Sequence, residues 1–109
     1  MTSKKVIAQV WERDGGKCWH CGGTENLTIQ HRVNRGMGGS KKLDRASNLI
    51  LLCWFTNFEI EASHTAAVVA KNQGWKVSKY VDSASVPVFS YGRQEWLLLD
   101  DDFGCKLAE

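Results

Sequence analysis

The sequence contains an apolar run, Asn48-Leu49-Ile50-Leu51-Leu52-Cys53, and an earlier β-favouring stretch, Asn26-Leu27-Thr28-Ile29-Gln30-His31. Each has the length of one strand, and the second run is apolar enough for a buried one. Residues 32–47, which join them, are rich in glycine and basic residues and predict an irregular loop. We therefore expect the two stretches to pair as strands, with His31 at the end of the first.

The segments on either side of this strand pair predict two helices. Apolar residues recur at helical spacing over residues 4–13, and Gly15-Gly16 is suited to end that helix. A second helix is expected to begin at Thr56 or Asn57, either of which could cap it, and to stop near Gly74. Helices that flank paired strands indicate an α+β fold.

The composition is that of a small globular protein. The chain has 109 residues, of which 43% are hydrophobic and 24% charged, which favours a folded domain over disorder. Residues 86–99 predict a β-hairpin, and we expect one domain over 1–109, with a core motif at 12–64 and a C-terminal extension at 74–109. The apolar runs are too short to cross a bilayer, and the N-terminus has no signal core, so we expect a cytoplasmic protein without a membrane partner.

Charge is distributed unevenly along the chain, although the net value is only +2. Residues 1–48 hold nine basic and four acidic residues, whereas residues 49–109 hold five basic and eight acidic ones. A basic half is compatible with a polyanionic partner, but charge alone favours a mixed, solvated surface.

Three of the four cysteines have the spacing of a metal site. Cys18-x-x-Cys21, followed by two glycines, can hold one tetrahedral Zn²⁺ from a single knuckle, and Cys53 can return to it from the second strand. Thr56 stands where a fourth cysteine would complete the pattern. A packed knuckle without metal and a redox-active dithiol are the alternatives to zinc. The candidates for a fourth ligand are Cys105, His20 and His64.

The order of His31, Asn48 and Asn57 around the glycine-rich loop resembles the HNH endonucleases. The resemblance covers residues 12–64, and the whole chain looks like the small free-standing HNH proteins often found in bacteriophage genomes. It implies a ββα-metal core, in which a β-hairpin and a helix hold one divalent cation. The expected fold is thus α+β, with an N-terminal helix, a cysteine knuckle and a C-terminal β-hairpin around that core. The matching stretches are Gln30-His31-Arg32, Gly38-Gly39, Asn48-Leu49, Leu52-Cys53, Asn57, and the zinc-branch-like segment Arg13–Gly22.

The resemblance also implies roles for individual residues. His31 would activate water, because imidazole titrates near neutral pH, and Asn48 would brace the loop that orients it. Asn57 would hold Mg²⁺ or Mn²⁺ together with Gln30 or Glu61. Many family members have an aspartate where this chain has Gln30. Glu61 lies four residues after Asn57 on one helix face, so it could supply the missing carboxylate or be a solvated charge.

Basic residues of the loop are expected to contact DNA, mainly through its phosphates rather than its bases. Among the aromatic residues, Trp19 in the knuckle has the best position for a DNA contact. The other tryptophans considered, expected in the core, are Trp11, Trp54, Trp75 and Trp96. The expected phosphate contacts are Arg32, Arg35, Lys41, Lys42 and Arg45.

The favoured function from sequence is a metal-dependent DNA endonuclease with His31 as general base. The alternative is a catalytically degenerate HNH fold that binds DNA or a protein. A third possibility is a metal-stapled structural protein without a nucleic-acid role. Binding of Mg²⁺ or Mn²⁺ at His31 and Asn57 separates the first from the others. The sequence does not indicate an oligomeric state.

Overall fold

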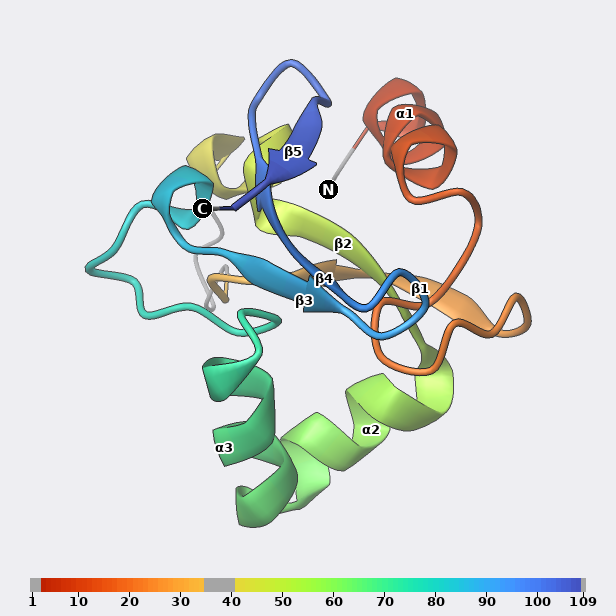
Figure 1. Ribbon diagram of the computed structural model, residues 1–109, viewed down its shortest axis with the longest axis vertical. Coiled ribbons are helices and arrows are strands. Elements are labelled where there is room, and N and C mark those ends of the chain that lie inside the picture. The colour runs from red at the N-terminus through yellow and green to blue at the C-terminus, as the bar shows by residue number, and fades with distance from the viewer. Residues whose placement is uncertain (1–2, 35–40, 109) are drawn as a thin grey trace.

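The computed structural model describes residues 3–34 and 41–108, with Lys41 and Lys42 described by their backbone only. Within these residues the fold is a small α+β domain with three α-helices and two small antiparallel sheets (Figure 1). Three short 3₁₀ helices lie at Lys41–Asp44, Ala46–Asn48 and Ser83–Ser85. The other elements are α1 (Lys4–Arg13), β1 (Leu27–His31), β2 (Leu49–Cys53), α2 (Trp54–Ala62), α3 (His64–Asn72), β3 (Val88–Ser90), β4 (Glu95–Leu99) and β5 (Cys105–Leu107).

The first sheet consists of β1 and β2, which pair antiparallel as predicted. Leu27 lies opposite Cys53 and His31 lies opposite Leu49, so the histidine ends its strand beside the start of β2. The first four residues of β2 are fully buried, which agrees with the apolar run that predicted this strand. The joining loop is more regular than expected, because two of the 3₁₀ helices lie within it.

The helix predicted at residues 4–13 is confirmed as α1. Hydrogen bonds at the C-terminal end of α1 attach this helix to β2 and to the residues just before it. The guanidinium of Arg13 donates to the carbonyls of Ala46 and Leu49, and the carboxylate of Asp14 accepts the N–H of Leu51 at 3.0 Å. These bonds fasten the segment that leads into the cysteine knuckle.

The single helix expected from Thr56 or Asn57 to Gly74 is wrong in two respects. It begins earlier, at Trp54, because the Sγ of Cys53 accepts the N–H of Thr56 and serves as the cap. It is also broken at Ser63, whose extended backbone ends α2 and whose hydroxyl caps α3. Two helices meeting in a V therefore lie beside the sheets (Figure 1).

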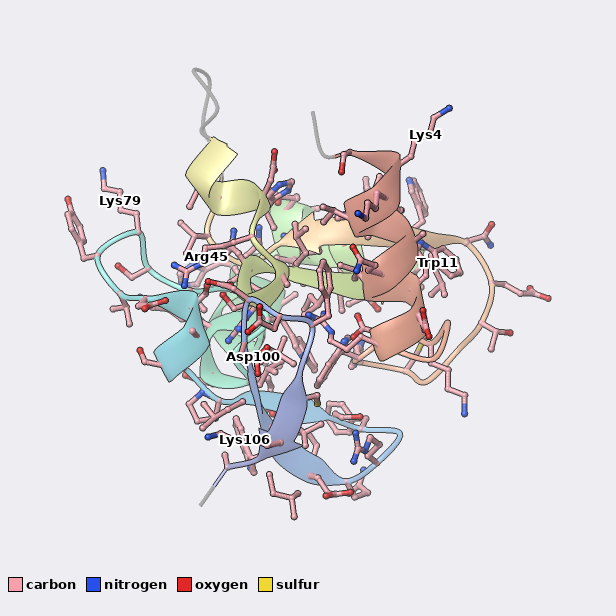
Figure 2. The ribbon with its side chains drawn as sticks, turned by 90° about the horizontal axis from the view of Figure 1, so that it is seen from above. Lys4, Trp11, Arg45, Lys79, Asp100 and Lys106 are labelled. Carbon is pink, nitrogen blue, oxygen red and sulfur yellow. The ribbon has the colours of Figure 1, made fainter. Side chains whose placement is uncertain are left out.

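The hairpin predicted over residues 86–99 is confirmed as β3 and β4, and a third strand, β5, was not predicted. The turn before β5 is held by Asp100, whose carboxylate accepts the N–H groups of Asp102 and Gly104 (Figure 2). All three residues of β5 are exposed, so it has no apolar alternation to mark it.

One core cluster joins the two sheets to the helices. It includes Ile50 and Leu52 from β2, Trp75 after α3, and Leu97 and Leu99 from β4. Among the described residues, no helix has the length and apolar character needed to span a membrane.

Candidate active site and metal centre

A cleft of about 360 Å³ lies between β1 and α2, and four predicted site residues line it. Gln30 and His31 come from β1, whereas Asn57 and Glu61 come from α2. The strand β1 pairs with β2, and α2 follows β2 directly. This packing brings together residues from distant parts of the sequence, up to 31 positions apart.

His31 has a carboxylate partner that the sequence did not reveal. Its Nε2 lies 2.7 Å from Oδ1 of Asp44, at the end of the first 3₁₀ helix of the loop. An ionised carboxylate only accepts hydrogen bonds, so in the neutral imidazole Nε2 carries the proton and Nδ1 is the acceptor. In the sequence, Asp44 is one acidic residue in a basic stretch, and no local pattern links it to His31.

The side chain of Asn48 bonds to the described residues at both ends of the segment between His31 and Asp44. Its side chain is fully buried, its Oδ1 accepts the N–H of Val33 at 2.8 Å, and its Nδ2 donates to the carbonyls of Val33 and Leu43. One amide therefore ties together the two ends of the loop, next to the His31–Asp44 pair.

Gln30 and Asn57 present amide groups to the cleft. Nε2 of Gln30 donates to the carbonyl of His31 at 3.0 Å, and Nδ2 of Asn57 donates to the hydroxyl of Thr28 at 3.3 Å. Because Cys53 caps α2, Asn57 lies inside the helix and is not its cap. The donation by both amide nitrogens fixes which atom of each group is the oxygen.

Glu61 is paired with a lysine that the sequence did not single out. Lys76, in the segment after α3, places its Nζ 3.5 Å from Oε1 of Glu61 and 2.6 Å from Oδ1 of Asn34. Desolvation lowers the pKa of Lys76, partly offset by the attraction of Glu61. Among the described residues, Glu61 is the one carboxylate that lines this cleft.

Two aromatic rings form one wall of the same cleft. Trp54 and Phe58 stack with ring centroids 5.3 Å apart and planes inclined by 17°, and their exposed fractions are 58% and 52%. The prediction that Trp54 lies in the core is therefore wrong. It is wrong also for Trp11 and Trp96, which are exposed, and right for Trp75. Trp19, the best-placed aromatic candidate for a DNA contact in the sequence, is buried.

The prediction that Arg32 contacts phosphates is wrong, because its side chain is completely buried. Its guanidinium donates to four backbone carbonyls, those of Gly74, Ser47, Ser83 and Val86, at 2.7–3.0 Å. Burial, with a smaller contribution from the charge of Arg13, lowers the pKa of Arg32 to about 10. Arg32 is thus a charged internal tie between β1 and the C-terminal half.

The other predicted phosphate contacts have different outcomes. Arg45, which is labelled in Figure 2, already pairs with two carboxylates. Its guanidinium lies 2.6 Å from Asp101 and 3.2 Å from Asp82, and its phosphate contact stays a prediction. The hydrogen bond from Arg45 lowers the pKa of Asp101. Arg35 and the side chains of Lys41 and Lys42 lie outside the described residues.

The sulfur atoms of Cys18, Cys21 and Cys53 form a cluster that could bind a metal, since all lie within 4.8 Å of one another. The Sγ atoms of Cys21 and Cys53 are 3.8 Å apart. A tetrahedral zinc site with Zn–S bonds of about 2.3 Å has sulfurs separated by about 3.8 Å. The cysteines are free thiols, and the spacing fits a metal-ligating group.

Backbone N–H groups surround the sulfurs of the cluster, although burial raises the pKa of the Cys21 thiol. One N–H points at each sulfur, from His20 to Cys18, from Gly23 to Cys21 and from Thr56 to Cys53, all at 3.4 Å. Desolvation raises the pKa of Cys53, but the hydrogen bonds from Thr56 and the neighbouring thiols outweigh it and lower that pKa overall.

The knuckle needs its two glycines for different reasons. Gly22 has a φ of +72°, in the left-handed region that other residues rarely adopt. A Cβ on Gly23 would lie 3.2 Å from the Sγ of Cys21, so a side chain there would press on the ligand atom.

Of the three candidates for a fourth ligand, His20 has a hydrogen-bonded link to the cluster, through Thr56. Its Nδ1 is 3.0 Å from the hydroxyl of Thr56, which in turn is 3.1 Å from the Sγ of Cys53. The imidazole packs against the rings of Trp75 and Tyr91, and the desolvation lowers the pKa of His20. Within the described part of the chain, neither Cys105 nor His64 belongs to the cluster.

Comparison of the chain with protein-family models, with curated proteins and with solved structures finds no match. The function must therefore be argued from the cleft and the cysteine cluster themselves.

Proposed function

We propose that this protein is an HNH-type endonuclease that hydrolyses DNA phosphodiester bonds with a divalent cation in the β1–α2 cleft. One observation carries the proposal. A histidine held by a carboxylate, two amides and one further carboxylate line a single cleft, on an antiparallel strand pair followed by a helix. A ββα-metal core would need such an arrangement, and this supports the proposal.

The side chains in the cleft suit a hard cation. The donor set comprises the amide oxygens of Gln30 and Asn57 and the carboxylate of Glu61, and oxygen is the ligand that Mg²⁺ and Mn²⁺ prefer. When bound, the cation would neutralise charge on the phosphate and assist departure of the 3′ oxygen. Because two of three donors are neutral amides, we expect weak binding that depends on Glu61.

His31 is the proposed general base. Asp44 holds the proton on Nε2, so Nδ1 can take a proton from water, and the carboxylate stabilises the imidazolium that forms. Asn48 acts indirectly: its hydrogen bond to the backbone next to Asp44 would keep that carboxylate beside the histidine. Asp44 and Asn48 are thus positioning residues for His31.

The cysteine cluster is the proposed site of a structural Zn²⁺. It fixes the knuckle to the start of α2, the helix that carries Asn57 and Glu61. The backbone supports this link, because the N–H of Trp19 donates to the carbonyl of Leu51 in β2. Zinc would therefore hold one wall of the cleft in place without taking part in the reaction.

A plasmid assay tests the proposed activity. Purified protein loaded with Zn²⁺ should convert supercoiled plasmid to nicked or linear forms in Mg²⁺ or Mn²⁺. It should leave the plasmid intact when brief EDTA treatment removes only the weakly bound cation. Failure to cleave plasmid or single-stranded DNA in any divalent cation, by protein that is folded and zinc-loaded, would contradict the proposal.

A catalytically degenerate DNA-binding protein is the second candidate, and the Lys76–Glu61 ion pair favours it. Among the described residues, Glu61 is the one carboxylate that lines the cleft, and Lys76 already pairs with it. The lysine therefore competes with a cation for that carboxylate. For this candidate we expect salt-sensitive DNA binding that EDTA leaves unchanged, with no cleavage. The nuclease is favoured because it also accounts for the His31–Asp44 pair.

The aromatic wall predicts a specific effect on binding. Replacing Trp54 by alanine is expected to weaken binding of single-stranded DNA about tenfold, because stacking on an aromatic ring contributes ~1–3 kcal/mol per base. Trp54 is exposed, so the unfolding free energy should change by less than about 0.5 kcal/mol. Fluorescence anisotropy of a labelled oligonucleotide measures the affinity.

Phe55 provides the matched control for this variant. It is exposed on the same helix but lies on the side of Cys21 and Cys53, away from the cleft. Phe55→Ala should bind DNA like the unmodified protein. Equal weakening by both variants would indicate a general apolar surface, such as a protein interface, and not a base-stacking wall.

A further inference from the structure

The cysteine cluster supplies three sulfur ligands for a metal. A candidate for the fourth ligand is a hydroxyl oxygen that lies against one of these sulfurs. Thr56 lies three residues after Cys53, on the first turn of α2, and its hydroxyl is 3.1 Å from the Sγ of Cys53. Thr56 is buried, so this oxygen is held against the cluster and is not a solvent-exposed group that turns freely.

His20 completes the arrangement from the other side. Its Nδ1 lies 3.0 Å from the same hydroxyl. Neither nitrogen of His20 is within 4.8 Å of all three sulfurs, since the group of mutually close ligand atoms holds the cysteines alone. The imidazole therefore lies behind the Thr56 hydroxyl and contacts that hydroxyl instead of the metal position.

We propose that the cluster binds its metal with three thiolates and one oxygen, the Thr56 hydroxyl, and that His20 orients that hydroxyl. This inference rests on the proposed zinc site and is independent of nuclease activity. A threonine hydroxyl has one proton, and its lone pairs can face a metal only if the proton points elsewhere. In the metal-free protein that proton can go to the Sγ of Cys53, and with a metal bound it would go to Nδ1 of His20, whose own proton is then on Nε2.

An oxygen at this corner changes the properties of the site. Three thiolates and a neutral hydroxyl hold Zn²⁺ more weakly than four thiolates, which are the soft, charged ligands of closed structural sites. Cys21 is exposed, so the metal also has a route to solvent. The centre should therefore exchange its metal more readily than a four-cysteine knuckle.

Cobalt substitution of the full-length protein, under reducing and oxygen-free conditions, tests the ligand set directly. The thiolate-to-cobalt charge-transfer band reports the number of sulfurs, and the visible d–d bands report the fourth donor. We expect a charge-transfer intensity of three thiolates in the unmodified protein, two in Cys21→Ser and four in Thr56→Cys. Thr56→Cys should also bind the metal more tightly.

Variants of Thr56 and His20 distinguish the proposed ligand from the residue that orients it. Thr56→Val should shift the d–d bands at unchanged charge-transfer intensity, and Thr56→Ser should restore them. His20→Ala should keep the thiolate band and lose about tenfold in affinity, as is typical for a group that hydrogen-bonds a ligand. Thr65→Val, on an exposed part of α3, is the control that should change nothing.

Three results would overturn the inference, and they are distinguishable. A loss of affinity in His20→Ala as large as in Cys21→Ser, with shifted d–d bands, would make His20 the ligand. Unchanged spectra in Thr56→Val would exclude the hydroxyl while leaving the zinc site intact. No cobalt binding by the unmodified protein, with thiols shown to be reduced, would contradict the zinc site itself.

Discussion

Replacing Arg32 by methionine is expected to destabilise the protein by about 3–5 kcal/mol, the range seen when one partner of a buried charged network is removed. The side chain is fully buried and donates to four carbonyls from three separate segments, in the 3₁₀ helix before β2, at the end of α3 and before β3. Methionine has a similar length but no donor, so these carbonyls would lose their bonds in a place that water cannot easily reach.

Urea denaturation followed by circular dichroism measures this effect. Small domains are typically stable by only about 5–15 kcal/mol, so Arg32→Met should be partly unfolded at room temperature or melt far below the parent protein. Arg32→Lys should lie between the two, because one ammonium can reach some of the carbonyls. Arg93→Met is the control, since Arg93 is exposed and makes only long contacts, to Glu95 at 3.6 Å and to the Sγ of Cys105 at 4.0 Å, among the described residues. A change below about 1 kcal/mol in Arg32→Met would contradict the role of Arg32 as an internal tie.

Replacing His31 by alanine is expected to lower the rate of DNA cleavage by about 10³-fold, because a positioned general base contributes ~10²–10⁴-fold. The loss should appear in the single-turnover rate, with the affinity for DNA little changed. Asp44→Asn should lower the rate by at least about tenfold, because an amide can donate to Nε2 and so place the imidazole proton on Nδ1. Labelled oligonucleotides in Mg²⁺ or Mn²⁺ provide the measurement.

The third histidine of the chain supplies the control for these variants. His64 is exposed at the first turn of α3 and does not line the cleft, so His64→Ala should cleave at the parent rate. If His31→Ala cleaves within about threefold of the parent protein after a contaminating nuclease is excluded, His31 is not the base.

The sequence predicted the local features of the fold well. α1 begins and ends where its apolar spacing indicated, and β1 and β2 begin one residue later than the stretches that predicted them. The knuckle and the third cysteine also meet as expected, because the return of β2 beside β1 brings Cys53 back to Cys18 and Cys21. These features depend on patterns within a few residues of one another, or on one antiparallel pairing.

Other features depend on contacts that a linear pattern does not encode. The role of Arg32 is decided by carbonyls 15 to 54 residues away, and backbone carbonyls have no sequence signature. Asp44 meets His31, and Lys76 lines the cleft, only through contacts between segments that are far apart in the sequence. The break at Ser63 carried a local signal, a serine that caps the next helix, but the alanines around it favoured one continuous helix.

The most direct test of the proposed cation site is paramagnetic broadening by Mn²⁺ in the NMR spectrum of the zinc-loaded, isotope-labelled protein. Mn²⁺ at low equivalents is predicted to broaden the signals of Gln30, His31 and Asn57 first, and Glu61→Gln should weaken that broadening. Signals of His64 and of the turn at Asp100 should stay sharp until much higher Mn²⁺ concentrations. Broadening confined to the acidic turn, with the signals of the cleft unchanged, would contradict the assignment of this cleft as a metal-dependent active site.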